Sequence, residues 1–244
     1  MRIIIVNPNT TATMTEAIGR AARCAASAGT EIIAVNPADG PVSIEGYYDE
    51  AFSVPGLLAE IAKGEAAGVS AHIIACFDDT GLEAARCASI APVIGIGEAA
   101  FHLASMLGYR FSVITTLSRS IAVIENNLLK YGLASRCGRV RACELPVLSL
   151  DDPASDAAAK IGTEIELAKQ QDKAEVIVLG CAGMADLAAR LASRHGVPVI
   201  DGVASAVKMA EALAALGLKT SKVGAYALPR PKAYLGAFAS FGTR

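Results

Sequence analysis

Two stretches of the chain, His72-Ile-Ile-Ala-Cys76 and Val176-Ile-Val-Leu-Gly-Cys181, each run from a short apolar segment into a cysteine. In both halves a helix-like stretch follows, and then a second apolar segment, Ala91-Pro-Val-Ile-Gly95 or Val197-Pro-Val-Ile-Asp-Gly202. The two halves therefore read as diverged copies of one unit. Such a duplication tends to place one thiol from each copy at the seam between two lobes, where the pair can face a small molecule from opposite sides.

The match continues upstream of the cysteines. The strand-like segment Ile3-Ile-Ile-Val6 leads into Asn7-Pro-Asn-Thr10, and Phe111-Ser-Val-Ile114 leads into Thr115-Thr116. Asn9 lies 67 positions before the first cysteine and Thr116 lies 65 before the second. The near-equal spacing supports the duplication.

Short Val/Ile-rich segments alternate with helix-like stretches along the chain, which is typical of parallel sheets covered by helices on both faces. We expect an α/β fold of two pseudo-symmetric lobes, each a mostly parallel sheet flanked by helices. The first lobe should comprise residues 1–97 plus 218–244, and the second residues 98–217. Strands are expected at about 2–6, 31–35, 71–76, 92–96, 110–115, 139–145, 175–180 and 197–200, with a last one at 222–228 that returns to the first lobe. Helices are expected near 12–28, 55–67, 81–89, 98–107, 119–132, 155–171, 184–195 and 203–216.

Composition narrows the class of protein. With 53% hydrophobic residues and 19% charged residues in 244 positions, the chain can bury a large core. A formal net charge of −2 gives no broad basic field for nucleic acid or an anionic membrane. The apolar N-terminal segment is too short for a signal peptide, and no apolar run reaches the ~18 residues of a membrane span. We therefore expect a cytoplasmic protein without nucleic-acid or membrane partners, and we expect a homo-oligomer.

The six cysteines include no C-x-x-C pair, so neither a zinc ribbon nor a thioredoxin motif is supported. Cys76 and Cys181 stand apart because each closes a strand and opens a helix, where aligned N–H groups favour a thiolate. The other four read as small hydrophobic or strand-edge residues. The three histidines are too scattered for a metal site, so no metal is expected.

One glycine motif, Gly95-x-Gly97-x-x-Ala100, follows a strand and opens a helix as a dinucleotide-binding fingerprint would. The acidic residue expected about 20 positions later is lacking. A joint between the two lobes accounts for both glycines instead.

Six motifs together resemble those of the hydantoin racemases, a branch of the aspartate/glutamate racemase superfamily. They are Asn7-Pro-Asn-Thr10, Ser43-Ile-Glu-Gly46, Ala75-Cys-Phe-Asp-Asp79, Val113-Ile-Thr-Thr116, Val178-Leu-Gly-Cys-Ala-Gly-Met184 and Pro198-Val-Ile-Asp-Gly202. The resemblance extends from Met1 to the region of residues 229–231. It implies an isomerase that racemises the C5 carbon of 5-monosubstituted hydantoins without a cofactor.

The chemistry agrees with the residues. Inverting a carbon acid needs a base on one face of a planar carbanion and an acid on the other, and two duplicated thiols, Cys76 and Cys181, can supply both. Amino-acid racemases of the superfamily typically show Cys-Asn-Thr in the first motif, whereas this chain has Cys76-Phe-Asp-Asp. The second motif, Cys181-Ala-Gly-Met, lacks an adjacent titrating helper. A hydantoin needs less activation, because the adjacent carbonyl delocalises the carbanion.

For recognition of the hydantoin ring we expect Asn9, Thr116 and the backbone N–H groups of Ala182 and Gly183, which can meet the carbonyl oxygens and the developing enolate. Thr115 and Asp79 are second choices, and Ser43, Ile44, Tyr47 and Phe77 are candidates to line a pocket for the C5 substituent. Helix capping is the competing interpretation for Asn9 and for Thr115-Thr116.

Three alternatives remain open from the sequence. Allantoin racemase, or another member of the superfamily acting on a small carbon acid, uses similar chemistry. A two-lobed binding protein would hold a ligand without reacting. A dithiol redox protein would join Cys76 to Cys181, which requires Cα atoms within about 7 Å.

Overall fold

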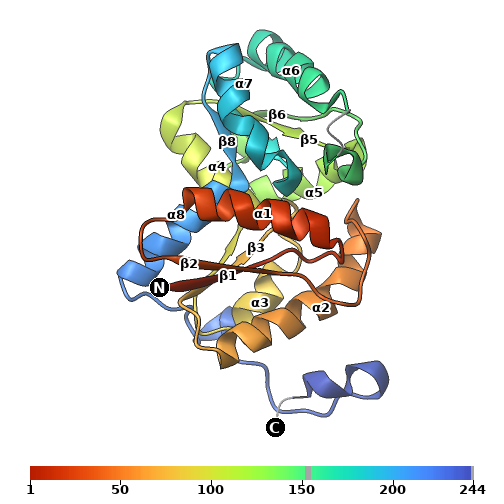
Figure 1. The fold of residues 1–244 in the computed structure, drawn as a ribbon, viewed down its shortest axis with the longest axis vertical. Coiled ribbons are helices and arrows are strands. Elements are labelled where there is room, and N and C mark those ends of the chain that lie inside the picture. The colour runs from red at the N-terminus through yellow and green to blue at the C-terminus, as the bar shows by residue number, and fades with distance from the viewer. Residues whose placement is uncertain (152–154, 243–244) are drawn as a thin grey trace.

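Two parallel four-stranded sheets form the frame of the molecule in a computed structural model that describes residues 1–151 and 155–242 (Figure 1). The first sheet has the order β2-β1-β3-β4 and the second the order β6-β5-β7-β8. The first sheet consists of β1 (Arg2–Val6), β2 (Glu31–Val35), β3 (Ala71–Ile74) and β4 (Val93–Gly95). The second consists of β5 (Phe111–Thr115), β6 (Cys137–Ala142), β7 (Val176–Gly180) and β8 (Val199–Asp201). The α/β fold with two parallel sheets is confirmed.

The two sheets repeat one topology, as a duplicated sequence requires. Ile3 is in register with Ala71 across β1 and β3, and Phe111 with Val176 across β5 and β7. Strands β3, β5 and β7 are buried along their whole length. Their Val- and Ile-rich runs are what strands covered on both faces require.

Eight α-helices follow the expected alternation within the described residues. They are α1 (Ala12–Ala25), α2 (Tyr47–Ala66), α3 (Leu82–Ala88), α4 (Ile96–Leu107), α5 (Ile121–Lys130), α6 (Ala157–Leu167), α7 (Ala188–His195) and α8 (Gly202–Ala215). The expected start of α2 at residue 55 is wrong, because the helix runs through Pro55 from Tyr47. Proline removes one backbone donor from a helix interior, and here the remaining bonds carry the helix past it.

Helix α4 follows β4 of the first sheet but packs on the second sheet, and helix α8 follows β8 of the second sheet but packs on the first. Helices α1 and α8 lie against the first sheet, and α4 and α5 against the second (Figure 1). The outer faces are covered by α2 and α3 on one side and by α6 and α7 on the other. Because α8 packs on β3 and β4, one apolar core runs through both sheets. The lobe boundaries at residues 97 and 217 stay predictions.

The two crossover helices start in direct contact. A Cβ atom on Gly202, the first residue of α8, would lie 2.6 Å from the carbonyl oxygen of Ile96 at the start of α4. Around this contact, Phe101 of α4 packs edge-on against Phe77 and stacks on Phe111 of β5, with ring centroids 5.3 and 6.0 Å apart. These aromatic contacts join the first sheet to the second.

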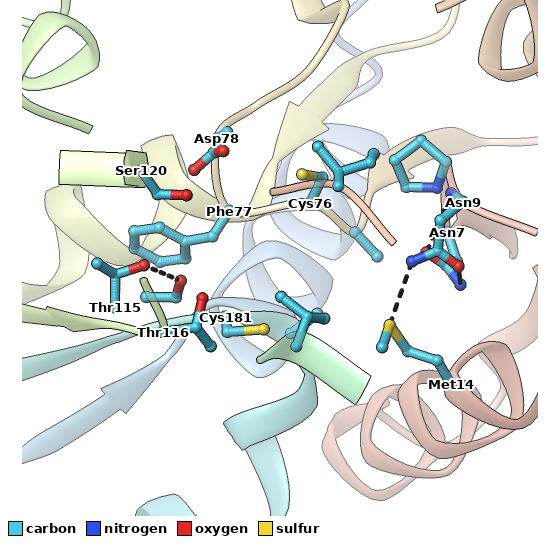
Figure 2. Close-up of a pocket in the computed structure, with 16 residues that line it drawn as sticks. Asn7, Asn9, Met14, Cys76, Phe77, Asp78, Thr115, Thr116, Ser120 and Cys181 are labelled. Carbon is cyan, nitrogen blue, oxygen red and sulfur yellow. Dashed lines mark hydrogen bonds between the residues drawn. The ribbon is translucent and has the colours of Figure 1, made fainter. Parts of the chain in front are cut away.

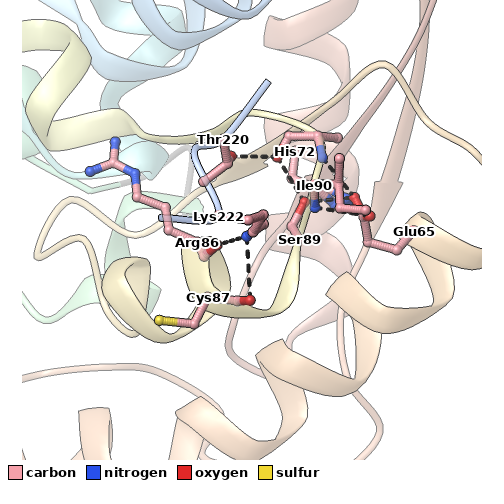
Figure 3. Close-up of polar contacts among 9 residues, drawn as sticks. Glu65, His72, Arg86, Cys87, Ser89, Ile90, Thr220 and Lys222 are labelled. Carbon is pink, nitrogen blue, oxygen red and sulfur yellow. Dashed lines mark hydrogen bonds and ion pairs between the residues drawn. The ribbon is translucent and has the colours of Figure 1, made fainter. Parts of the chain in front are cut away.

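The expected strand at 222–228 is wrong. That segment instead contains a one-turn 3₁₀ helix, Gly224–Tyr226, and it crosses α3. The Thr220 hydroxyl donates to the carbonyl of Ala91, and the Lys222 ammonium donates to the carbonyls of Arg86 and Cys87 (Figure 3). Two side chains of the tail are thus tied to a helix end and a loop and not to a sheet edge.

Replacing Gly202 with Ala tests the contact between the crossover helices. Helix propensity alone would favour alanine by up to about 1 kcal/mol. The clash with Ile96 should outweigh this gain and lower the free energy of unfolding by about 1–3 kcal/mol, measured by chemical denaturation. The matched variant Gly162→Ala on α6 meets only the His195 ring, at 3.1 Å and beyond, and should lose less. Equal stabilities of the two variants would show that the junction is not tightly packed.

Candidate active site

A cavity of about 420 Å³, including its open mouth, lies where the carboxyl ends of β1, β3, β5 and β7 meet. In each sheet the chain leaves the two central strands toward opposite edges. In the first sheet β1 leads to β2 at one edge and β3 leads to β4 at the other, and in the second sheet β5 and β7 lead to β6 and β8 in the same way. Such a switch point leaves a crevice beyond the strand ends, and it is where open α/β sheets bind ligands. Here two crevices face each other and form one cavity.

Sixteen residues line this cavity, and seven of the ten site residues expected from the sequence are among them. Those seven are Asn9, Cys76, Phe77, Thr115, Thr116, Cys181 and Ala182. Ser43, Asp79 and Gly183 do not line it, although their neighbours Ile44, Asp78 and Ala182 do. Ile44, a candidate to line the pocket for the C5 substituent, also lines the cavity. The lining residues not named from the sequence are Asn7, Pro8, Met14, Ala75, Asp78, Ser120, Val147 and Gly180.

Cys76 and Cys181 lie on opposite sides of the cavity. Cys76 follows β3 of the first sheet and Cys181 follows β7 of the second, and Figure 2 shows their sulfur atoms facing the space between the lobes. All six cysteines are thiols and not disulfides. The geometry gives a bound molecule one thiol on each side.

The expectation that a helix N-terminus lowers the pKa of Cys76 is wrong. The chain after Cys76 forms a turn, and α3 begins only at Leu82, so no helix dipole acts on this sulfur. Burial raises the pKa of the Cys76 thiol well above its ordinary value, and the charge of Asp78 raises it further. Burial and the charge of Asp78 therefore favour the thiol form of Cys76. Cys181 directly precedes a short 3₁₀ helix, Ala182–Leu187.

Three carboxyl groups gather beside Cys76. Burial raises the pKa of Asp78 to about 7, with a further rise from the charge of Glu50, while a hydrogen bond from Ser120 acts in the opposite direction. Burial likewise raises the pKa of Asp79 to about 7 and raises that of Glu50. Near neutral pH the site can therefore store protons on carboxyl groups as well as on sulfur. Asp78 was missed as a site residue, although its place two positions after Cys76 pointed to it.

Asp79 serves the fold and not the cavity. Its carboxylate accepts hydrogen bonds from the backbone N–H groups of Gly97 and Glu98, at 2.9 and 2.8 Å, and from the Tyr131 hydroxyl at 2.7 Å. A Cβ atom on Gly95 or Gly97 would overlap this carboxylate. The glycine motif of this joint therefore makes room for an aspartate that binds the N-terminus of α4.

Asn9 and Thr115 hold the rim of the cavity together. The side-chain oxygen of Asn9 accepts from the backbone N–H of Thr11 at 2.9 Å and from the Asn7 amide at 2.8 Å. Its amide nitrogen lies 3.3 Å from the sulfur of Met14 (Figure 2). Thr115 donates to the carbonyl of Gly180 at 3.2 Å and so joins the ends of β5 and β7.

The capping interpretation is wrong for Thr115 and Thr116, because Leu117 stands at the start of the next helical turn. Thr116 instead lines the cavity near Cys181 (Figure 2). Met14, Ser120 and Val147 could not have been found from motifs. Met14 enters the cavity from the first turn of α1, Ser120 from the one-turn helix Ser118–Ser120, and Val147 from the segment after β6.

Other site classes find no support in the part of the chain that the structure describes. No group of three His, Cys, Asp or Glu side chains there could hold a metal ion. His72 is buried in β3, where its Nε2 lies 3.1 Å from Glu65 (Figure 3). His195 pairs with Glu166. No described helix is long and apolar enough to span a membrane.

Known proteins share both the sequence and this architecture. The family model for Asp/Glu/Hydantoin racemase matches residues 3–210. This chain belongs to the Asp/Glu/Hydantoin racemase family. A hydantoin racemase from Rhizobium meliloti is 54% identical over 236 residues, which cover 97% of this chain and 98% of the relative.

Solved structures agree with the assignment. An allantoin racemase from Klebsiella pneumoniae superposes with a TM-score of 0.97 at 49% identity and covers 99% of both chains. A glutamate racemase from Francisella tularensis shares the fold with a TM-score of 0.66 at 17% identity, over 90% of this chain and 84% of its own. The protein is thus a racemase, an isomerase acting on a small molecule.

The raised pKa of Asp78 predicts how stability depends on pH. Because the folded-state pKa of about 7 exceeds the ordinary value of 3.8, the contribution of this group is complete below about pH 4 and is lost as pH rises through 7. Asp78→Asn should therefore reduce the loss of unfolding free energy between pH 4 and pH 8, measured by denaturant titration at both pH values. The exposed Asp39→Asn should leave that loss as in the parent. An unchanged pH dependence in Asp78→Asn would mean that this carboxyl is ionised in the folded protein.

Proposed function

We propose that this racemase inverts C5 of 5-monosubstituted hydantoins by two-base proton transfer between Cys76 and Cys181, without a cofactor. The observation that carries the proposal is the pair of thiols, one from each copy, on opposite sides of one cavity. A base and an acid on opposite faces are what inversion of a planar carbanion needs.

The reaction moves one proton off the ring and one onto it. A thiolate removes the C5 proton, so the C5–H bond breaks and an S–H bond forms. The electron pair passes to the C4 carbonyl and gives a planar enolate. The thiol on the other side then donates its proton to C5, and its sulfur becomes the thiolate. Either enantiomer can react, because the two sulfurs exchange roles.

Polar groups on the cavity wall support the charged intermediate. The Thr116 hydroxyl and the backbone N–H groups after Cys181 can donate to the enolate oxygen as its charge develops. In the resting enzyme we assign Cys76 as the thiol, since burial and Asp78 both raise its pKa. Cys181 is then the thiolate of the pair.

The side chains on the cavity wall suit a substituted hydantoin. Met14, Ile44 and Val147 give it apolar side chains that can pack against an alkyl or arylalkyl group at C5. Asp78 and Ser120 could instead pair with a ureido group, and the high similarity to an allantoin racemase makes allantoin the second candidate substrate.

Incubation with enantiopure substrates tests the proposal. Optical rotation of benzyl-, isobutyl- and ureido-substituted hydantoins should decay to zero without added cofactor, and exhaustive dialysis against a chelator should not slow the decay. The thiols supply both acid and base, which is the reason that no metal is needed. Constant rotation with all three compounds would refute the proposed substrate class. Activity lost on chelation and restored by a metal would refute the mechanism.

Single substitutions of the cysteines test the two-base assignment. Cys76→Ser and Cys181→Ser should each lose racemisation by at least ~10²-fold, the lower range for a missing acid or base. The remaining thiolate can still exchange the C5 proton of the enantiomer that presents it, so in deuterated water the two variants should label opposite enantiomers without loss of rotation. Cys24→Ser, at an exposed cysteine, is the control. Labelling of the same enantiomer by both variants would point to a single base.

A further inference from the structure

A chain of hydrogen-bonded groups leads from Cys76 away from the substrate cavity. The Thr80 hydroxyl lies 3.3 Å from the Cys76 sulfur and 3.2 Å from a carboxylate oxygen of Glu50. Thr80 is only 1% exposed and sits on the turn between β3 and α3, whereas Glu50 comes from α2. Two separate elements thus place a carboxyl, a hydroxyl and a thiol in line.

Glu50 reaches a second cavity, which is distinct from the one that holds Cys76 and Cys181. This cavity measures about 800 Å³ including its open mouth, and it is lined from α2, α3 and α5. Glu50 lines only the second cavity, Cys76 lines only the first, and Asp78 contributes to both. Thr80 therefore connects a thiol at the substrate with a carboxyl at another opening.

Two-base racemisation creates a need for such a connection. Each turnover exchanges the protonation states of the two cysteines, so the thiol becomes the thiolate and the thiolate becomes the thiol. In that state the enzyme can react only with the enantiomer that it has just released. Further conversion of the same substrate requires that both sulfurs exchange protons with solvent. Cys76 is only partly exposed, on the wall of the substrate cavity, so a second route to solvent can speed its exchange.

We propose that Thr80 and Glu50 form a proton relay that resets Cys76 between turnovers from the second cavity. The inference rests on the proposed two-base function. After Cys76 has donated its proton to C5, the Thr80 O–H proton passes to the thiolate and the Glu50 carboxyl proton passes to the Thr80 oxygen. Glu50 then takes a proton from water, so one proton moves from solvent to the sulfur of Cys76. The reverse sequence removes it. The proton that Cys181 took from C5 leaves to solvent through the first cavity, and the two transfers together restore the starting pair of thiol and thiolate.

The surroundings make Glu50 easier to protonate than an exposed glutamate. Burial raises its pKa, while the hydrogen bond with Thr80 lowers it. The charged or titratable groups that share its cavity are Tyr47, Asp78, Asp79, Glu83 and Lys130. Four carboxyls around one lysine keep the local potential negative, which holds protons at the entrance of the relay.

Steady-state kinetics of Thr80→Val test the relay, since valine keeps the shape and removes the hydroxyl. A slow reset lowers kcat and KM together, so kcat should fall roughly tenfold, less than the 10²–10⁴-fold loss of a direct acid or base, with kcat/KM unchanged. Glu50→Gln should behave alike because an amide cannot pass the proton. Thr80→Ser should restore kcat. Glu60→Gln, on the same helix and paired with Lys63, is the control.

Isotope washout gives a second readout that a structural role would not change. In deuterated water, Thr80→Val should leave more protium at C5 of the racemised substrate than the parent, measured by mass spectrometry. A proton that Cys76 removes in one turnover then stays on its sulfur and is returned to C5 in a later one. The relay would be overturned if kcat/KM of Thr80→Val fell by the same factor as kcat. It would also be overturned if Thr80→Val, with a melting temperature equal to that of the parent, kept the kcat and the isotope washout of the parent. If the parent itself racemises none of the hydantoins, the proposed function fails first and the relay falls with it.

Discussion

The contact between the two crossover helices is the constraint on which the geometry of this enzyme depends. Because Gly202 has no side chain, the start of α8 lies directly against the backbone of Ile96 at the start of α4. Each helix can then cover the opposite sheet, and the carboxyl ends of β3 and β7 are brought face to face. The separation of the two sulfurs follows from this packing and not from any bond between them. A rigid frame matters here, since small displacements of reacting groups are costly in catalysis.

Around this frame the protein keeps polar groups that cost stability. Asp79 has a left-handed backbone, with φ of 52°, and its buried carboxylate is held by two backbone N–H groups and a tyrosine. Asp78 and Glu50 are kept near it with raised pKa values. Strain and desolvation of this kind persist only where surrounding structure fixes them, and they gather at functional sites. In this enzyme they surround Cys76, the thiol that we propose to change its protonation state during catalysis.

The comparison with a solved structure of low sequence identity separates fold from chemistry. A glutamate racemase at 17% identity shares the fold, so the two facing strand ends do not by themselves choose a substrate. In this chain the residue after Cys76 is Phe77, which packs against Phe101 in the core, and the residue after Cys181 is Ala182. The substrate contacts that we propose are therefore backbone groups and the side chains of other lining residues, such as Thr116, Asp78 and Val147.

The sequence by itself determined the repeated β–α order, the eight strands of the two sheets, and the position of a cysteine at the end of β3 and of β7. These features are local, since short Val- and Ile-rich runs and their punctuation suffice to predict them. Tertiary structure alone decided which sheet each crossover helix covers, and that the tail from Thr220 onward ties to a helix end. It also decided that Asp78 enters the cavity while Asp79 turns away, which depends on one left-handed residue. The pKa of Cys76 could not be read from its place in the sequence, because burial and the charge of Glu50 come from segments that meet Cys76 only in the folded protein.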